Sequence, residues 1–228
     1  MEKIIILGTG GHAGSLTDIV ECVGKYKIAG YVDNNKSETL NEGKYHIIGS
    51  DDDLENIYKS GIYNAALGIG FLGKSDIRKK LYKRLKDIGY YIPIIEDPSA
   101  ILSKYIDIEE GVFIGKGAIV NCYVTIKKGS IINSGAIVEH NCKIGEFSHI
   151  SVGSILCGNV TIGSSSFIGA NATIIQGVSI GNYCIIGAGT TVTKNVEDYY
   201  MVYKNHKKYL GGGYERGCAG GGAWWGVF

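Results

Sequence analysis

Every sixth residue from Leu102 to Val192 is a branched aliphatic, and this unbroken rule constrains the fold of the chain more than any other feature. A small or β-branched side chain stands four residues after each aliphatic, beginning with Val112. A repeat of six residues predicts a parallel β-helix, in which three hexads form one coil of about 18 residues. The two regular positions point inward, and the repeat length leaves the handedness open. The aliphatic positions are Leu102, Ile108, Ile114, Val120, Ile126, Ile132, Val138, Ile144, Ile150, Leu156, Ile162, Ile168, Ile174, Ile180, Ile186 and Val192.

Glycine follows the aliphatic directly in several hexads, where we expect the corner of a coil to need a positive φ. Cysteines 142 and 184 belong to the small inward series, so we expect them to fill the core rather than to bind metal. The glycines are Gly115, Gly145, Gly163, Gly169, Gly181 and Gly187.

Residues one coil apart form columns on the outside of the predicted β-helix. One column is Phe113, Ile131, His149, Phe167 and Ile185, and a second is Ile119, Ile137 and Ile155. Apolar columns on the outside of a prism predict burial against another subunit. A closed homotrimer of three-sided prisms is the simplest assembly that buries them.

The first ninety residues have a different pattern, in which short apolar runs alternate with segments of helical periodicity. This alternation predicts a small α/β domain with a mostly parallel sheet. We place this domain at residues 1–95, the β-helix at 96–202 and a C-terminal tail at 203–228. The expected strands are 3–7, 27–32 and 64–69, and the expected helices are 15–23, 51–58 and 74–85.

A glycine-rich turn joins the first expected strand to the first expected helix. Gly8, Gly10 and Ala13 fit the pattern GxGxxG/A, and Asp33 lies 20 residues beyond Ala13, where such folds place an acid near a ribose. A helix N-terminus behind glycines suits phosphate oxygens. NAD, another nucleotide diphosphate, or a tight turn with no ligand all satisfy this pattern.

Composition excludes several classes of partner. The 23 Lys and Arg against 22 Asp and Glu give a net charge of +1, so no electrostatic argument favours nucleic acid or a membrane surface. There is no apolar run of membrane-spanning length and no secretory signal, so we expect a cytoplasmic protein. The six cysteines include no CxxC pair, which argues against a zinc knuckle or a disulfide framework.

The combination of GTGGHAGS near the N-terminus with VEHNCKIGEFSHISVG in the repeats resembles the bacterial sugar acetyltransferases of the PglD/NeuD type. The resemblance extends from Met1 to about Val202. It implies an α/β Rossmann-like domain that binds a UDP-linked amino sugar, followed by an all-β left-handed parallel β-helix. It also implies a homotrimer with acetyl-CoA between neighbouring helices and no metal.

The resemblance also implies roles for individual residues. His140 is the expected general base, and Asn141 stands where the family commonly has an acid that orients this histidine. Neutral imidazole suits the task because it titrates close to working pH. His149, Ala170 and Ala188 match positions that contact acetyl-CoA. The expected nucleotide-sugar contacts are Gly10, Gly11 and His12 near the phosphates and sugar, Asp33 and Asn34 at the nucleotide, and Gly70.

The leading hypothesis is N-acetylation of the 4-amino group of a UDP-linked amino-dideoxy sugar by direct transfer. Two alternatives stay open: O-acetylation of a sialic-acid-like sugar, and a non-catalytic protein that binds sugar nucleotides. A β-helical zinc enzyme is disfavoured because the repeats contain only His140 and His149. The tail carries Trp224, Trp225 and Phe228 in place of the family's usual GxPAK ending, which frames the adenine side of CoA.

Overall fold

The computed structural model describes residues 1–34, 44–71, 76–204 and 206–210. The chain divides into two compact units. The first comprises Met1–Gly70 and Ile77–Pro98, and the second comprises Phe71–Asp76 and the chain from Ser99 onward. The segment 211–228, and with it the expectations for Trp224, Trp225 and Phe228, lies outside the described residues.

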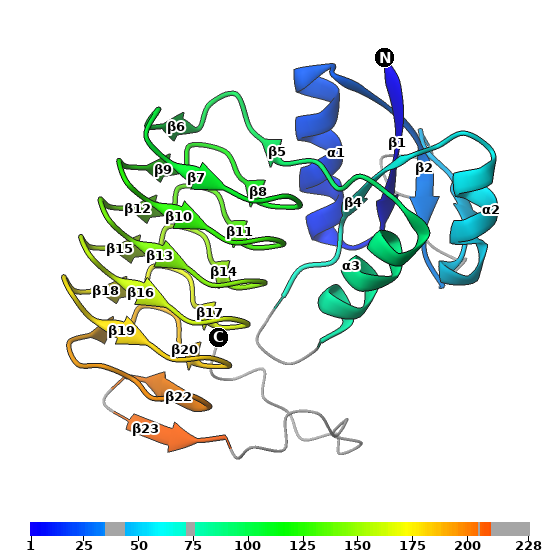
Figure 1. Ribbon diagram of the computed structural model, residues 1–228. Helices are drawn as coiled ribbons and strands as arrows, with labels where there is room; N and C mark the ends of the chain where they lie inside the picture. The colour runs from blue at the N-terminus through cyan, green and yellow to red at the C-terminus, as the bar shows by residue number, and fades with distance from the viewer. Residues whose placement is uncertain (35–43, 72–75, 205, 211–228) are drawn as a thin grey trace. The chain divides into compact units, whose positions relative to one another are not determined.

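The first unit is a parallel four-stranded sheet with the strand order β3-β2-β1-β4 and helices beside it (Figure 1). The buried run Ile4–Leu7 of β1 lies between β2 and β4 and forms the centre of the core. This arrangement confirms the α/β prediction. The strands of this sheet are β1 (Glu2–Leu7), β2 (Tyr26–Val32), β3 (Ile47–Gly49) and β4 (Asn64–Leu67), and the short strand β5 (Ile95–Glu96) lies outside it. The helices are α1 (Gly11–Val23), the 3-10 helix η2 (Asp51–Asp53), α2 (Leu54–Lys59) and α3 (Ile77–Ile88).

Helix α1 begins four residues earlier than the sequence predicted. Gly10 is its N-cap, with extended φ and ψ of −78° and −177°, so Gly11 and His12 lie in the first helical turn rather than in a loop. The low helix propensity of glycine suggested a longer turn, but the N–H groups of a first turn need no partner within the helix. The helix ends at Val23, and its C-cap residue Gly24 takes the left-handed conformation with φ 66°.

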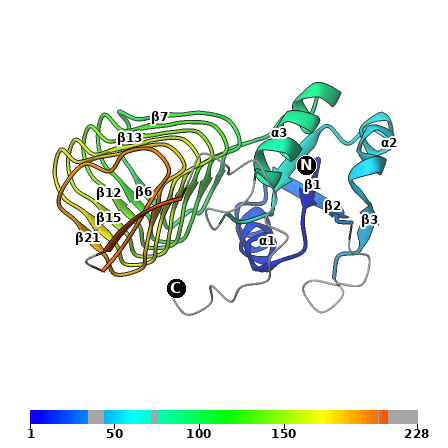
Figure 2. The ribbon, with the colours of Figure 1, turned by 90° about the horizontal axis from the view of Figure 1, so that it is seen from below.

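The second unit is a left-handed parallel β-helix whose two-residue strands stack coil on coil; Figure 2 shows the coils superimposed nearly along their axis. We name its three faces after one residue of each. The Ile101 face is β6 (Ile101–Leu102), β9 (Ile119–Val120), β12 (Ile137–Val138), β15 (Ile155–Leu156), β18 (Thr173–Ile174) and β21 (Thr191–Val192). The Lys143 face is β7 (Asp107–Ile108), β10 (Thr125–Ile126), β13 (Lys143–Ile144), β16 (Thr161–Ile162) and β19 (Ser179–Ile180). The His149 face includes β8 (Phe113–Ile114), β11 (Ile131–Ile132), β14 (His149–Ile150), β17 (Phe167–Ile168), β20 (Ile185–Ile186), β22 (Tyr200–Tyr203) and β23 (His206–Tyr209).

The core of the β-helix is formed by the two series that the repeat predicted to point inward. From Ile114 to Val192 every aliphatic of the first series is buried, and every member of the second series from Val112 to Val196 is buried too. The first coil is the exception, because Leu102 and Ile108 are half-buried. The prediction of core positions is therefore confirmed along nearly the whole β-helix.

Polar residues of the inward series are stacked as a ladder of hydrogen bonds. The Ser148 hydroxyl donates to the Gly163 carbonyl at 2.6 Å, and the Ser166 hydroxyl donates to the Gly181 carbonyl at 2.7 Å. The Ser166 hydroxyl oxygen also accepts the backbone N–H of Cys184 at 2.9 Å. Each buried hydroxyl thus satisfies backbone groups of the coil above it, which makes these polar residues compatible with the core.

The expectation that glycines directly after the aliphatics need a positive φ is wrong. Positive φ occurs three residues after the aliphatic, at positions such as Asn141 and Gly153. The predicted glycines are required by close contact instead: a β-carbon at Gly145 would lie 2.6 Å from the Gly163 carbonyl carbon, and one at Gly163 would lie 2.5 Å from the equivalent atom of Gly181. Stacked corners leave no room for a side chain there.

The apolar column on the His149 face is buried within a single chain, which corrects the expectation that another subunit covers it. Phe113, Ile131, His149, Phe167 and Ile185 all have at most 6% of their surface exposed. Phe167 and Ile185 pack in a cluster with Phe71 and Met201, which come from segments outside the hexad series. Met201 lies on β22, and the chain returns as the antiparallel strand β23 within the segment expected to be a tail.

Candidate functional site

The glycine-rich turn lies at the carboxyl end of β1. Gly8 has φ +94°, and a β-carbon there would lie 2.7 Å from the Ile69 side chain. At Gly10 and Gly11 a β-carbon would meet no atom within 4 Å. The first glycine is therefore required by the backbone, whereas Gly10 and Gly11 leave open space beside the N-terminus of α1, where the N–H groups suit an anion.

Two polar pairs lie at the end of β2. The Thr9 hydroxyl donates to Oδ2 of Asp33 at 2.7 Å, which fixes this carboxylate beside the turn. The Asn34 amide donates to Oδ2 of Asp51 at 2.9 Å and accepts the Asp51 backbone N–H at 3.1 Å. The two predicted nucleotide contacts are thus held by Thr9 and Asp51, neither of which the sequence analysis singled out.

The end of β4 completes this cluster. A β-carbon at Gly70 would lie 3.6 Å from Cβ of His12, so the two predicted contacts are neighbours. Arg78 of α3 is buried and donates through Nη1 to the carbonyls of Leu67 and Ile69 at 2.8 and 2.6 Å. Burial lowers the pKa of this guanidinium to about 9. The carboxyl ends of β1, β2 and β4 therefore meet in one place, where α/β folds bind ligands.

His140 lies at the corner of the β-helix between β12 and β13, where the Ile101 face meets the Lys143 face. Nδ1 of its ring is 3.2 Å from the amide nitrogen of Asn141, which takes φ +61°. The Glu139 carboxylate accepts the Asn121 side-chain amide at 2.9 Å and the His140 backbone N–H at 3.4 Å. The predicted base is thus tethered by its own neighbour, with a carboxylate held one residue away.

His149 is buried on β14. Its Nδ1 lies 2.6 Å from the Phe71 carbonyl oxygen and its Nε2 lies 3.1 Å from the Asn133 amide nitrogen. The ring also meets Phe167 edge to face, with ring centroids 5.2 Å apart. The structure therefore places this residue in a packed, hydrogen-bonded setting rather than on an open cleft.

Ala170 and Ala188 stack one coil apart at the corner where the His149 face meets the Ile101 face. The Gly189 N–H donates to the Ala170 carbonyl at 2.8 Å, and the Ala188 side chain is exposed. His140 is at the other edge of the Ile101 face. Within one chain the structure therefore brings the two alanines together, but places them at a different corner from the predicted base.

Both units match known protein families. Residues 3–85 match the PglD N-terminal domain, and residues 141–176 and 159–194 match the bacterial transferase hexapeptide family of six repeats. A comparison with curated protein sequences gave no match.

Solved structures resemble almost the whole chain. PerB from Caulobacter crescentus, in complex with CoA and GDP-perosamine, is 30% identical, with 92% of this chain and 98% of that chain covered and a TM-score of 0.85. The chain belongs to the sugar acetyltransferases of the PglD/NeuD type. A mutant of GDP-perosamine N-acetyl transferase from the same organism is 29% identical over 92% of this chain and 98% of that chain, with a TM-score of 0.85. The acetyltransferase domain of PglB from Neisseria gonorrhoeae, in complex with acetyl coenzyme A, is 27% identical over 92% and 99%, with a TM-score of 0.82.

The protein is therefore an acetyltransferase that uses acetyl-CoA and a sugar acceptor. This identification confirms the acetyltransferase and acetyl-CoA predictions, because solved relatives bind CoA or acetyl-CoA.

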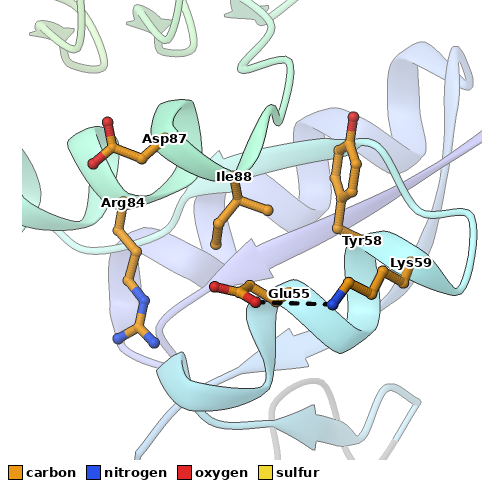
Figure 3. Close-up of a pocket in the computed structure, with 6 residues that line it drawn as sticks. All are labelled: Glu55, Tyr58, Lys59, Arg84, Asp87 and Ile88. Carbon is orange, nitrogen blue, oxygen red and sulfur yellow. Dashed lines mark ion pairs between the residues drawn. The ribbon is translucent and has the colours of Figure 1, made fainter.

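A separate hollow of this acetyltransferase lies between α2 and α3 of the first unit (Figure 3). Its volume is about 480 Å³, and its lining includes an ion pair between Glu55 and Lys59 at 3.9 Å. None of the predicted substrate contacts lines it. The lining residues are Glu55, Tyr58, Lys59, Arg84, Asp87 and Ile88.

A metal cluster and a membrane-spanning helix are both absent from the described residues of the acetyltransferase, 1–34, 44–71, 76–204 and 206–210. No group of three or more His, Cys, Asp or Glu side chains there is placed to hold a metal ion. Across the same part of the chain, no helix is long and apolar enough to cross a bilayer.

Proposed function

We propose that this acetyltransferase N-acetylates the 4-amino group of a UDP-linked amino-dideoxy sugar, with His140 as the general base. The proposal is carried by the similarity of nearly the whole chain to an enzyme solved with CoA and a nucleotide-linked sugar, a relative of which is named an N-acetyl transferase. The cluster of Gly10, His12 and Asp33 supports a nucleotide-sugar site in the first unit.

The reaction needs one proton acceptor. A neutral amine attacks the thioester carbonyl of acetyl-CoA, so that a C–N bond forms and the C–S bond breaks. Nε2 of His140 takes the proton from the attacking nitrogen, and that proton passes to the departing CoA thiolate. For Nε2 to accept, Nδ1 must carry the ring proton. The active arrangement therefore has the Asn141 amide turned so that its Oδ1 faces Nδ1.

The nucleotide is the least constrained part of the substrate. The resemblance favours UDP, while GDP is the second candidate because the two Caulobacter structures contain GDP-perosamine. Asp33 is the residue that we expect to contact the ribose or base. The Thr9 hydroxyl donates to its Oδ2, which holds this carboxylate at the end of β2 beside the glycine-rich turn.

We propose a homotrimer in which the Ile101 face is the interface. Ile101 and Ile155 are 64% and 37% exposed, and Ile119 and Ile137 lie half-buried between them in the same column. A stripe of four outward isoleucines is costly to leave in water. His140 and the Ala170–Ala188 pair border this face on opposite edges, which supports a site that combines groups from two chains.

Thiol release from acetyl-CoA, measured with a panel of acceptors, tests the proposed function. The panel contains UDP- and GDP-linked 4-amino-dideoxy sugars, the corresponding 4-hydroxy sugars and free sialic acids. We expect turnover with a nucleotide-linked amine and none with the hydroxyl counterparts. Turnover with hydroxyl acceptors alone would replace the proposal by O-acetylation, and no turnover with any acceptor would favour a non-catalytic protein.

A further inference from the structure

The His140 ring lies against Gly158, which is one coil further along the β-helix. The backbones of these corners are joined, because the Asn159 N–H donates to the His140 carbonyl at 2.9 Å. A β-carbon at Gly158 would lie 2.6 Å from both Cε1 and Nε2 of His140 and 3.3 Å from Cδ2. The imidazole therefore occupies the space in which a side chain of residue 158 would stand.

The conformation of the backbone does not explain this glycine. Gly158 is not among the residues with positive φ, and the following residue, Asn159, takes the left-handed conformation with φ 60°. An L-amino acid would therefore fit the backbone of residue 158. The close approach of the His140 ring is the contact that excludes it.

Two contacts thus fix the imidazole from different sides. The Asn141 amide lies 3.2 Å from Nδ1, and the Cε1–Nε2 edge fills the space that the missing β-carbon of Gly158 leaves open. The methyl group of an alanine at residue 158 would overlap this edge of the ring and force the ring to turn or tilt. Either movement changes the direction of Nε2 and stretches the contact with Asn141.

We infer that Gly158 is a positioning residue for the general base, which acts by providing a seat for the His140 ring. The inference rests on the proposed role of His140. Because displacement of a reacting group by about 1 Å can cost about 100-fold in rate, we expect Gly158→Ala to lower kcat by at least about 10-fold.

The test combines activity with two measurements that need no substrate. The first is the imidazole 15N–1H spectrum, in which the His140 signals are assigned from His140→Ala and compared between wild type and Gly158→Ala. The second is the melting temperature of Gly158→Ala and of the double variant with His140→Ala. Gly14→Ala is the matched control, because Gly14, like Gly158, does not have a positive φ, and a β-carbon there meets no atom within 4 Å.

We expect Gly158→Ala to move the His140 signals, to lower kcat and to lower the melting temperature only when His140 is present. Gly14→Ala should leave kcat and the His140 signals unchanged. Unchanged His140 signals in Gly158→Ala overturn the inference even if kcat falls, because the loss then comes from elsewhere. An equal loss of melting temperature with and without His140 also overturns it. Inactivity of the wild type would instead count against the proposed function, and the spectra would still test whether Gly158 positions the His140 ring.

Discussion

Asn141→Asp should move the acid limb of the kcat–pH profile to higher pH by about one unit. The amide nitrogen of Asn141 lies 3.2 Å from Nδ1 of His140 at the surface of the β-helix. A carboxylate oxygen at that distance stabilises the imidazolium by about 1.3 kcal/mol with the dielectric constant of water. That energy corresponds to about one pH unit.

The acid limb moves to higher pH because His140 must be neutral to act as the base. Stabilising the protonated ring means that a higher pH is needed to obtain the neutral imidazole that accepts a proton, so activity at low pH falls. Above the limb, the carboxylate should raise kcat, because it accepts a hydrogen bond only and so always holds the proton on Nδ1. An amide can hold either tautomer.

Asn141→Gly is the matched control for the backbone. Asn141 has φ +61°, a conformation that glycine adopts freely, so this variant removes the side chain without straining the corner. We expect its limb to stay at the wild-type pH while kcat falls, because the ring loses its tether. An acid limb that is the same in wild type and Asn141→Asp would refute the coupling between residue 141 and the base.

Three further predictions concern stability, binding and reactivity. Ser166→Ala should destabilise the fold by about 2–4 kcal/mol in urea unfolding, because the Gly181 carbonyl and the buried Cys184 N–H both lose their partner. Ser166→Cys should cost less, since the next coil has a cysteine at this position. Thr9→Val should raise KM for the nucleotide sugar about 5-fold and leave kcat and KM for acetyl-CoA unchanged. Thr9→Ser keeps the hydroxyl that holds Asp33, so its KM for the nucleotide sugar should stay at the wild-type value. Equal KM values in both variants would contradict the role of the Thr9 hydroxyl in holding Asp33. Iodoacetamide at neutral pH should label the exposed Cys22 in the folded protein but not the buried Cys142. Burial raises the pKa of the Cys142 thiol to about 11, so little reactive thiolate is present at that pH. Rapid labelling of Cys142 would contradict its place in the core.

The β-helix was predictable because its period depends on local geometry that repeats in every coil. The inward positions from Ile114 to Val192 followed directly from the spacing. The reason for glycines such as Gly145 did not, since it is a contact with a residue one coil away whose distance appears only when the coils are stacked. Burial of the column at Phe167 was also missed, because Phe71 and Met201 lie outside the repeat.

The candidate site was predictable where a residue belongs to a known local pattern, and not where its role depends on a contact with a distant residue. Gly10 and Asp33 were found because strand–turn–helix units place such residues at the end of a sheet. Thr9 was missed because a threonine in a turn has no sequence signal that reveals its bond to Asp33. Arg78 was missed for the same reason: an arginine in an amphipathic helix is ordinary until its bonds to the Leu67 and Ile69 carbonyls are seen. A search for a polar residue directly beside a turn glycine could have suggested Thr9.

The role of His140 is tested most directly by the acetylated product that wild type and His140→Ala form from acetyl-CoA and a nucleotide-linked 4-amino sugar. We expect the wild type to form one amide on the sugar for each CoA released, as identified by mass spectrometry and NMR. The variant should be slower by at least about 100-fold, as is typical for loss of a general base. A His140→Ala variant that forms the amide at nearly the wild-type rate would show that His140 is not the general base.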